Sequence, residues 1–137
     1  MKDEKSLPQL SLRHLALRVS DLPRARAFYE GLLGMKTVWA PDSHNIYLSF
    51  GTDNLALHQT DGEAPDDNGR MDHFGFVVTH KTDVDQMATR MQQAGVPILK
   101  GVREHRDGSY SFYMADPDGN VIQILYEPRR VERTDGQ

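Results

Sequence analysis

The chain has 137 residues, of which 38% are hydrophobic and 26% are charged, and its formal net charge is −4 at pH 7. This size and composition suit one globular domain or two small repeated units. The absence of cysteine excludes disulfide frameworks, thiolate metal sites and iron–sulfur clusters. The acidic balance argues against a nucleic-acid partner, and the lack of a long apolar run or a secretory leader predicts a cytoplasmic protein without membrane contact.

The first half of the chain predicts a strand, a helix and three more strands. Residues 1–10 are polar and are expected to form a loose arm before a folded domain of residues 11–128. Apolar alternation predicts a strand over 12–19, and Ser20 or Asp21 with Pro23 in the first turn predicts a helix that Gly34 ends. The three strands that follow are predicted over residues 36–40, 45–50 and 54–60.

The second half repeats this order after a segment of linker composition, residues 61–70. A strand is predicted over 72–79, and a helix capped by Thr82 or Asp83 is predicted to end at Gly95. The remaining predicted elements are strands at about 97–103, 109–115 and 120–127, followed by a polar tail over 129–137. The sequence therefore predicts an α+β fold of two tandem βαβββ modules, at about residues 11–60 and 71–128.

Strand alternation separates an apolar face from a polar one on four of these strands. The apolar residues suit packing on a helix, and each opposite face carries one polar group of the metal-ligand type. These groups are His14, His58, His73 and Gln123. If the sheets curve into a cup, all four could converge, and a metal, a ligand or water would then have to satisfy them.

A single strand histidine is more often a hydrogen-bonded structural residue than a ligand, whereas three on one predicted inner face favour a site. The other three histidines, His44, His80 and His105, lie in polar or turn-like segments. They are expected to be solvated.

Four stretches of the chain resemble the vicinal oxygen chelate superfamily, which includes glyoxalase I, extradiol dioxygenases, fosfomycin-resistance proteins and bleomycin-binding proteins. They cover most of residues 12–127 and are Leu12–Leu22, Ala27–Met35, Asp72–Val78 and Phe112–Gln123. The resemblance implies paired βαβββ modules that form a cup-like mixed sheet with the helices outside. It also implies a homodimer and metal ligands at His14, His58, His73 and Gln123.

The implied ligand set departs from the family at two positions. Gln123 stands where the family's metalloenzymes usually have glutamate, and His58 stands where glyoxalase I proteins have glutamate. The set would then be neutral, so a bound divalent ion should attract an anionic oxygen ligand. Three imidazoles favour Fe, Ni, Co or Zn over Mg or Ca.

The resemblance implies a metal-dependent enzyme of glyoxalase or dioxygenase type, acting on a small molecule through adjacent oxygens. With the usual glutamates missing, the base of a glyoxalase-type reaction would be His58 or Glu127. Ala16 replaces a threonine typical of fosfomycin-resistance proteins and so weakens that reading. The alternative is a metal-free drug-binding protein of the bleomycin-resistance type. In either case the candidate pocket aromatics are Trp39, Tyr47, Tyr110 and Tyr113.

Overall fold

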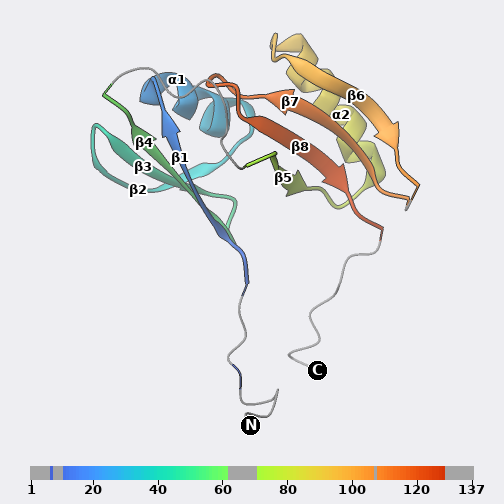
Figure 1. Ribbon diagram of the computed structural model, residues 1–137, viewed down its shortest axis with the longest axis horizontal. Helices are drawn as coiled ribbons and strands as arrows, with labels where there is room; N and C mark the ends of the chain where they lie inside the picture. Colours follow the sequence, from blue (N-terminus) through green and yellow to red (C-terminus); the bar gives the residue numbers. More distant parts are fainter. Residues whose placement is uncertain (1–6, 8–10, 62–70, 107, 129–137) are drawn as a thin grey trace. The chain divides into compact units, whose positions relative to one another are not determined.

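The computed structural model describes Leu7 and residues 11–61, 71–106 and 108–128. The chain divides into two compact units, residues 1–63 (unit 1) and 64–137 (unit 2). Each unit has one strand, one helical segment and three further strands in that order, so the predicted α+β class with two βαβββ modules is confirmed (Figure 1). Most of the predicted arm and linker, and the whole predicted tail, lie outside the described residues.

Unit 1 contains a mixed sheet, sheet 1, with the strand order β1-β4-β3-β2. β1 (His14–Val19) pairs in parallel with β4 (Asn54–Gln59). β3 (Asn45–Ser49) pairs antiparallel with β4 and with β2 (Lys36–Asp42). Each strand end lies within two residues of its predicted position.

Alternation along β1 decides which face of sheet 1 the helical segment covers. Leu17 and Val19 are buried, whereas His14, Ala16 and Arg18 are exposed. The covered face continues across the sheet through the residues paired with the apolar positions of β1, and it packs against the buried side chains of the helical segment. The buried residues of this sheet face are Leu17, Val19, Leu55, Leu57, Ile46 and Leu48, and those of the helical segment include Leu22, Ala25 and Phe28. We call the opposite face the open face of sheet 1.

The helical segment of unit 1 begins as predicted but changes its winding. α1 (Leu22–Arg26) has Asp21 as its N-cap, whose Oδ1 accepts a hydrogen bond of 3.1 Å from the backbone N–H of Arg24. The next six residues, η2 (Ala27–Leu32), form a π-helix instead of continuing the α-helix. The wider turn accommodates two consecutive large buried side chains, Phe28 and Tyr29. Hydrophobic spacing alone does not reveal this change.

Unit 2 contains a second mixed sheet, sheet 2, with the strand order β5-β8-β7-β6. Its strands are β5 (Phe74–Val77), β6 (Ile98–Glu104), β7 (Tyr110–Ala115) and β8 (Val121–Tyr126). β5 pairs in parallel with β8, and the other pairs are antiparallel. Phe112, Met114, Ile122 and Ile124 are buried on the face that α2 (Lys81–Gln93) covers. The opposite face is the open face of sheet 2.

The start of α2 differs from the prediction by two or three residues. Its N-cap is His80, and Asp83 is the third residue of the helix. The Asp83 carboxylate accepts a hydrogen bond of 2.9 Å from the backbone N–H of His80. The acidic residue therefore closes a capping box and is not the cap itself. Gly95, at φ +77°, ends the helix as predicted.

Across the described ranges, no helix combines the length and the apolar character that crossing a membrane would require.

Candidate functional site

His14 lies on the open face of sheet 1, where a neighbouring strand fixes its ring. Its register partner on β4 is Asn54, whose Oδ1 lies 2.9 Å from His14 Nδ1. Because an amide oxygen only accepts hydrogen bonds, Nδ1 carries the proton and donates it. In the neutral ring, Nε2 then holds the lone pair that a metal or a hydrogen-bond donor needs.

His58 is held in the same way but at another point of the open face. Its Nδ1 donates a hydrogen bond of 2.6 Å to Oδ1 of Asn45 on β3. Its register partner on β1 is Arg18, four residues beyond His14. Four residues along a strand, plus one strand spacing, separate the two histidine Cα atoms by about 14 Å. The structure therefore does not bring His58 beside His14.

His73 lies one residue before β5 in unit 2. Its Nδ1 donates to Oδ2 of Asp72 at 2.6 Å, so a carboxylate takes the place that the asparagine amides take in unit 1. The Tyr113 ring stands edge-on to the imidazole, with ring centroids 5.2 Å apart. A carboxylate that accepts from Nδ1 is a frequent partner of metal-bound histidine, because it fixes the ring and its tautomer.

Gln123 lies on the open face of sheet 2, and its amide nitrogen is engaged. Nε2 donates a hydrogen bond of 3.1 Å to Oγ of Ser111 on β7, and Ser111 is 1% exposed. The same Oγ lies 2.9 Å from Nε2 of His105. A serine hydroxyl that accepts from the amide has its own proton left to donate to His105. These hydrogen bonds direct the amide nitrogen of Gln123 to Ser111. The amide oxygen, Oε1, remains as the atom that could act as a ligand.

The role of His105 corrects one sequence expectation. His105 is half-buried and in hydrogen-bond contact with Ser111, and is not simply solvated. The other two histidines expected to be solvated, His44 and His80, are exposed. Hydropathy could not predict the contact of His105 with Ser111, because that contact depends on the conformation of the turn between β6 and β7.

The backbone beside Gln123 needs a glycine. Gly75 is the register partner of Gln123. A Cβ at Gly75 would lie 3.0 Å from the backbone oxygen of Gln123 and 3.2 Å from Cδ2 of Leu125. The missing side chain therefore allows β5 and β8 to approach closely at the position of the proposed ligand.

The four candidate pocket aromatics are distributed over three sheet faces, two of them in unit 2. Trp39 stacks on Tyr47 on the open face of sheet 1, with centroids 5.0 Å apart. Tyr113 lies on the open face of sheet 2, with Lys100 Nζ 5.3 Å from its ring centroid. Tyr110 points to the helix side, where its hydroxyl donates to Oδ1 of Asp85 on α2 at 2.6 Å. That hydrogen bond raises the pKa of Tyr110 and ties it to α2.

Glu127, the other candidate base, is exposed and follows the last residue of β8.

The donors present suit a transition metal. Three imidazoles have Nδ1 hydrogen-bonded to an oxygen acceptor, and one amide has its nitrogen hydrogen-bonded to a hydroxyl. Such donors fit Fe, Co, Ni or Zn better than Mg or Ca. Within the described part of each unit, no three His, Asp or Glu side chains form a group that could hold a metal ion alone.

Comparison with known proteins identifies the family. A model of the Glyoxalase/Bleomycin resistance protein/Dioxygenase superfamily matches residues 11–124. The glutathione transferase FosA of Serratia marcescens is 33% identical over 116 residues, covering 83% of this chain and 79% of FosA. The metallothiol transferase FosB of Lysinibacillus sphaericus is 32% identical over 115 residues, covering 83% of this chain and 80% of FosB.

Solved structures agree with this result. The lactoylglutathione lyase from Agrobacterium tumefaciens superposes with a TM-score of 0.72 at 26% identity, covering 88% of this chain and 96% of that one. Both the sequence match and the structural match extend over most of the chain. The chain belongs to the Glyoxalase/Bleomycin resistance protein/Dioxygenase superfamily.

Proposed function

We propose that this protein is a metal-dependent enzyme that acts on a small molecule through two neighbouring oxygen atoms. Its metal ligands are His14, His73 and Gln123. One observation carries the proposal: each of these side chains has its second polar atom hydrogen-bonded to Asn54, Asp72 or Ser111, so the remaining atom is the one that can coordinate. Such outer partners fix ring orientation and tautomer in metalloproteins.

A divalent ion held there would act as a Lewis acid toward the two substrate oxygens. The three protein ligands are neutral, so the positive charge of the metal ion would have to be balanced by the substrate. An enediolate, catecholate or carboxylate satisfies that requirement. Because Gln123 is an amide, the set has no carboxylate to act as a base, and a proton-transfer step would fall to His58 or Glu127.

The relatives support an enzyme without fixing its reaction. FosA and FosB are named as transferases, and the structural relative is named as a lyase. The name of FosB, a metallothiol transferase, refers to a metal, and several activities within one family are consistent with one site that serves several reactions. We therefore propose the metal-bound, oxygen-chelating substrate as the common feature and leave the reaction type to a substrate panel of hemithioacetals, catechols, epoxides and α-keto acids.

Metal content tests this proposal directly. The wild-type chain, purified without a histidine tag, should contain or take up stoichiometric Fe, Co, Ni or Zn by elemental analysis. His73→Ala removes an imidazole and its link to Asp72, so tight binding should be lost. His44→Ala is the matched control, because it removes an exposed histidine outside the ligand set and should leave metal content unchanged.

Two results would contradict the proposal. Stoichiometric metal in a folded His73→Ala variant would remove His73 from the ligand set. A wild-type chain that takes up none of the four metals would favour the metal-free binding protein, in which the same polar groups hold a ligand by hydrogen bonds.

We further propose that the protein is a homodimer, as the family resemblance implies. Each sheet ends in two edge strands, β1 and β2 in sheet 1 and β5 and β6 in sheet 2. Edge strands present unpaired backbone groups, and association of two copies is a common way to cover them.

A further inference from the structure

His58 has neighbours that suggest a role other than metal binding. Its register partners are Arg18 on β1 and Asn45 on β3. Residues opposite one another on adjacent strands point to the same face, so all three share the open face of sheet 1. Arg18 is exposed, and no carboxylate among the described residues lies within ion-pair distance of it. Within the described ranges, a cation without a counter-ion therefore lies next to an oriented imidazole.

Two aromatic rings extend this patch. The Tyr47 ring stands edge-on to the His58 ring, with centroids 6.0 Å apart and an interplanar angle of 80°. Trp39 stacks on the same tyrosine at 5.0 Å and 23°, and 59% of Trp39 is exposed. The two stacked rings lie on the same face as the polar pair, and the exposed Trp39 ring is accessible to stacking by another planar group.

On this face, Arg18 and the nearest described carboxylate lie at opposite sides of sheet 1. The carboxylate is Asp42 on the edge strand β2, three strands from β1, and its Oδ1 accepts a hydrogen bond of 2.9 Å from Nδ2 of Asn45. β1, β3 and β4 contain no aspartate or glutamate, and Arg18 is the single fully charged side chain on these three strands. A guanidinium binds a carboxylate through two parallel hydrogen bonds, which gives geometric selectivity as well as attraction. The partner that complements this surface is therefore an anion with a planar apolar body.

We propose that Arg18, His58, Tyr47 and Trp39 form a binding subsite for aromatic carboxylates. The carboxylate binds Arg18, and the ring lies against Trp39 and Tyr47. Because Nδ1 of His58 donates to Asn45, its Nε2 accepts a hydrogen bond from a hydroxyl of the ligand. This names the substrate class for the function proposed above, but the subsite itself lies wholly in unit 1 and needs no metal.

The single tryptophan of the chain makes the subsite measurable. Emission from Trp39 should change saturably when benzoate is added to the full-length protein in EDTA. Benzamide, a neutral molecule of nearly the same shape, should produce no saturable change. Arg18→Gln should weaken benzoate binding at least about tenfold, the loss expected when a charged hydrogen-bond partner is removed.

Arg24→Gln is the matched control. This substitution removes the same charge from α1, the helix that covers the opposite face of sheet 1. The variant should bind benzoate as the wild type does. Equal binding of benzoate and benzamide, no saturable benzoate signal, or an unaffected Arg18→Gln variant would each overturn the subsite. Because EDTA is present throughout, these failures leave the metal proposal untouched, and failure of the metal proposal leaves this result unchanged.

Discussion

The two modules have the same strand order but place different groups beside their histidines. In each, the residue two positions after the histidine pairs with a residue on the last strand of the module. That pair is Ala16 with Ala56 in unit 1 and Gly75 with Gln123 in unit 2. Unit 2 therefore combines an imidazole with an amide, whereas unit 1 offers an imidazole and a methyl group at the same positions. The repeat therefore supplies the same strand pairing twice, but only unit 2 has a second proposed ligand at this position.

The same comparison separates His58 from the proposed ligands. His58 pairs with Arg18, and the matching pair in unit 2 is Val77 with Leu125. His58 is thus the counterpart of Leu125, two residues beyond the position of Gln123. A shift of two residues preserves the face of a strand. Alternation therefore predicts the face on which His58 lies, but it does not show that His58 lies two residues further along its strand than the counterpart of Gln123.

Changes to the Ser111 contact should produce the largest effect in unit 2. If Ser111 turns the oxygen of Gln123 toward a metal, Ser111→Ala should lower metal affinity about 10–100-fold, as for other outer partners of metal ligands. In a Gln123→Glu background, both terminal atoms are oxygens, so orientation matters less and the same change should cost much less. Gln123→Glu alone should tighten binding by adding a carboxylate. Competition with a chromophoric chelator measures all four affinities.

Ser43→Ala, at an exposed serine between β2 and β3, controls for the loss of a hydroxyl. An equal loss in both backgrounds would mean that Ser111 supports the fold of β7 and not the orientation of the amide. Unchanged affinity in both would remove Ser111 and His105 from the site while leaving the other ligands in place. Neither result could arise from failure of the metal proposal, because wild-type binding is measured in parallel.

The Gly75 and Ala16 pair offers a test of smaller expected size. Gly75→Ala places a methyl group 3.0 Å from a backbone oxygen of β8, so the two strands must separate slightly. We expect the free energy of unfolding to fall by about 1–2 kcal/mol, as for other overpacked positions, because the Leu125 side chain can move but the backbone cannot easily do so. Chemical denaturation with matched m-values measures the change.

The reciprocal variant, Ala16→Gly, controls for the intrinsic difference between the two residues. It should cost about 0.5–1 kcal/mol through backbone entropy alone. If Gly75→Ala is neutral or stabilising, close approach of β5 and β8 does not explain the glycine, and the difference between the modules at this position has no packing cause.

Much of the fold follows from local sequence patterns, whereas the site depends on features that these patterns do not encode. Alternating apolar residues and the Asp21 and Gly34 signals located the strands and helix ends, because burial and capping act over a few residues. The π-helical turn at Phe28 and Tyr29 was missed because two adjacent buried rings break the helical spacing.

For the candidate site, alternation predicted the open faces of His14 and Gln123 correctly. It could not predict that Asn54 holds His14 or that Ser111 holds Gln123, since these contacts depend on strand register. The contact of Asp72 with His73 joins neighbours in the sequence but depends on side-chain orientation, which alternation does not give. For the same reason, alternation could not predict how far apart His14 and His58 lie along their strands. The face on which a side chain lies follows from its position in one strand, whereas its place relative to residues of the next strand depends on how the two strands pair.

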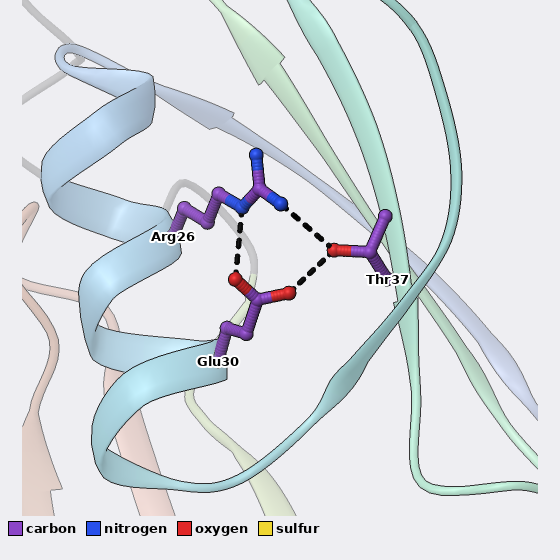
Figure 2. A network of polar contacts seen from close by, with 3 residues as sticks. All are labelled: Arg26, Glu30 and Thr37. Carbon is purple, nitrogen blue, oxygen red and sulfur yellow. Dashed lines mark hydrogen bonds and ion pairs between the residues drawn. The ribbon is translucent and has the colours of Figure 1, made fainter.

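The helical segments differ in how charged groups attach them to their sheets. In unit 1, Arg26 donates to Glu30 at 2.9 Å and to Thr37 of β2 at 3.2 Å, and Thr37 donates to Glu30 at 2.5 Å, which closes a three-residue ring (Figure 2). In unit 2, Lys81 pairs with Glu104 of β6, and Tyr110 of β7 donates to Asp85. The pKa of Glu30 is lowered, first by Thr37 and then by Arg26.

Glu30→Gln should therefore have the smallest effect, and one that depends on pH. Because the folded-state pKa of Glu30 lies below its ordinary value of 4.5, its contribution is complete above that value and is lost as the pH falls through the folded-state pKa. We expect the variant to be less stable by under about 1 kcal/mol at pH 7, since Glu30 is about one-third exposed and solvent screens the pair. The difference from wild type should shrink toward zero in acid. Thr37→Val removes the main cause of the shift, so an NMR titration of Glu30 in that variant should show a higher pKa; an unchanged pKa would assign the shift to Arg26 alone.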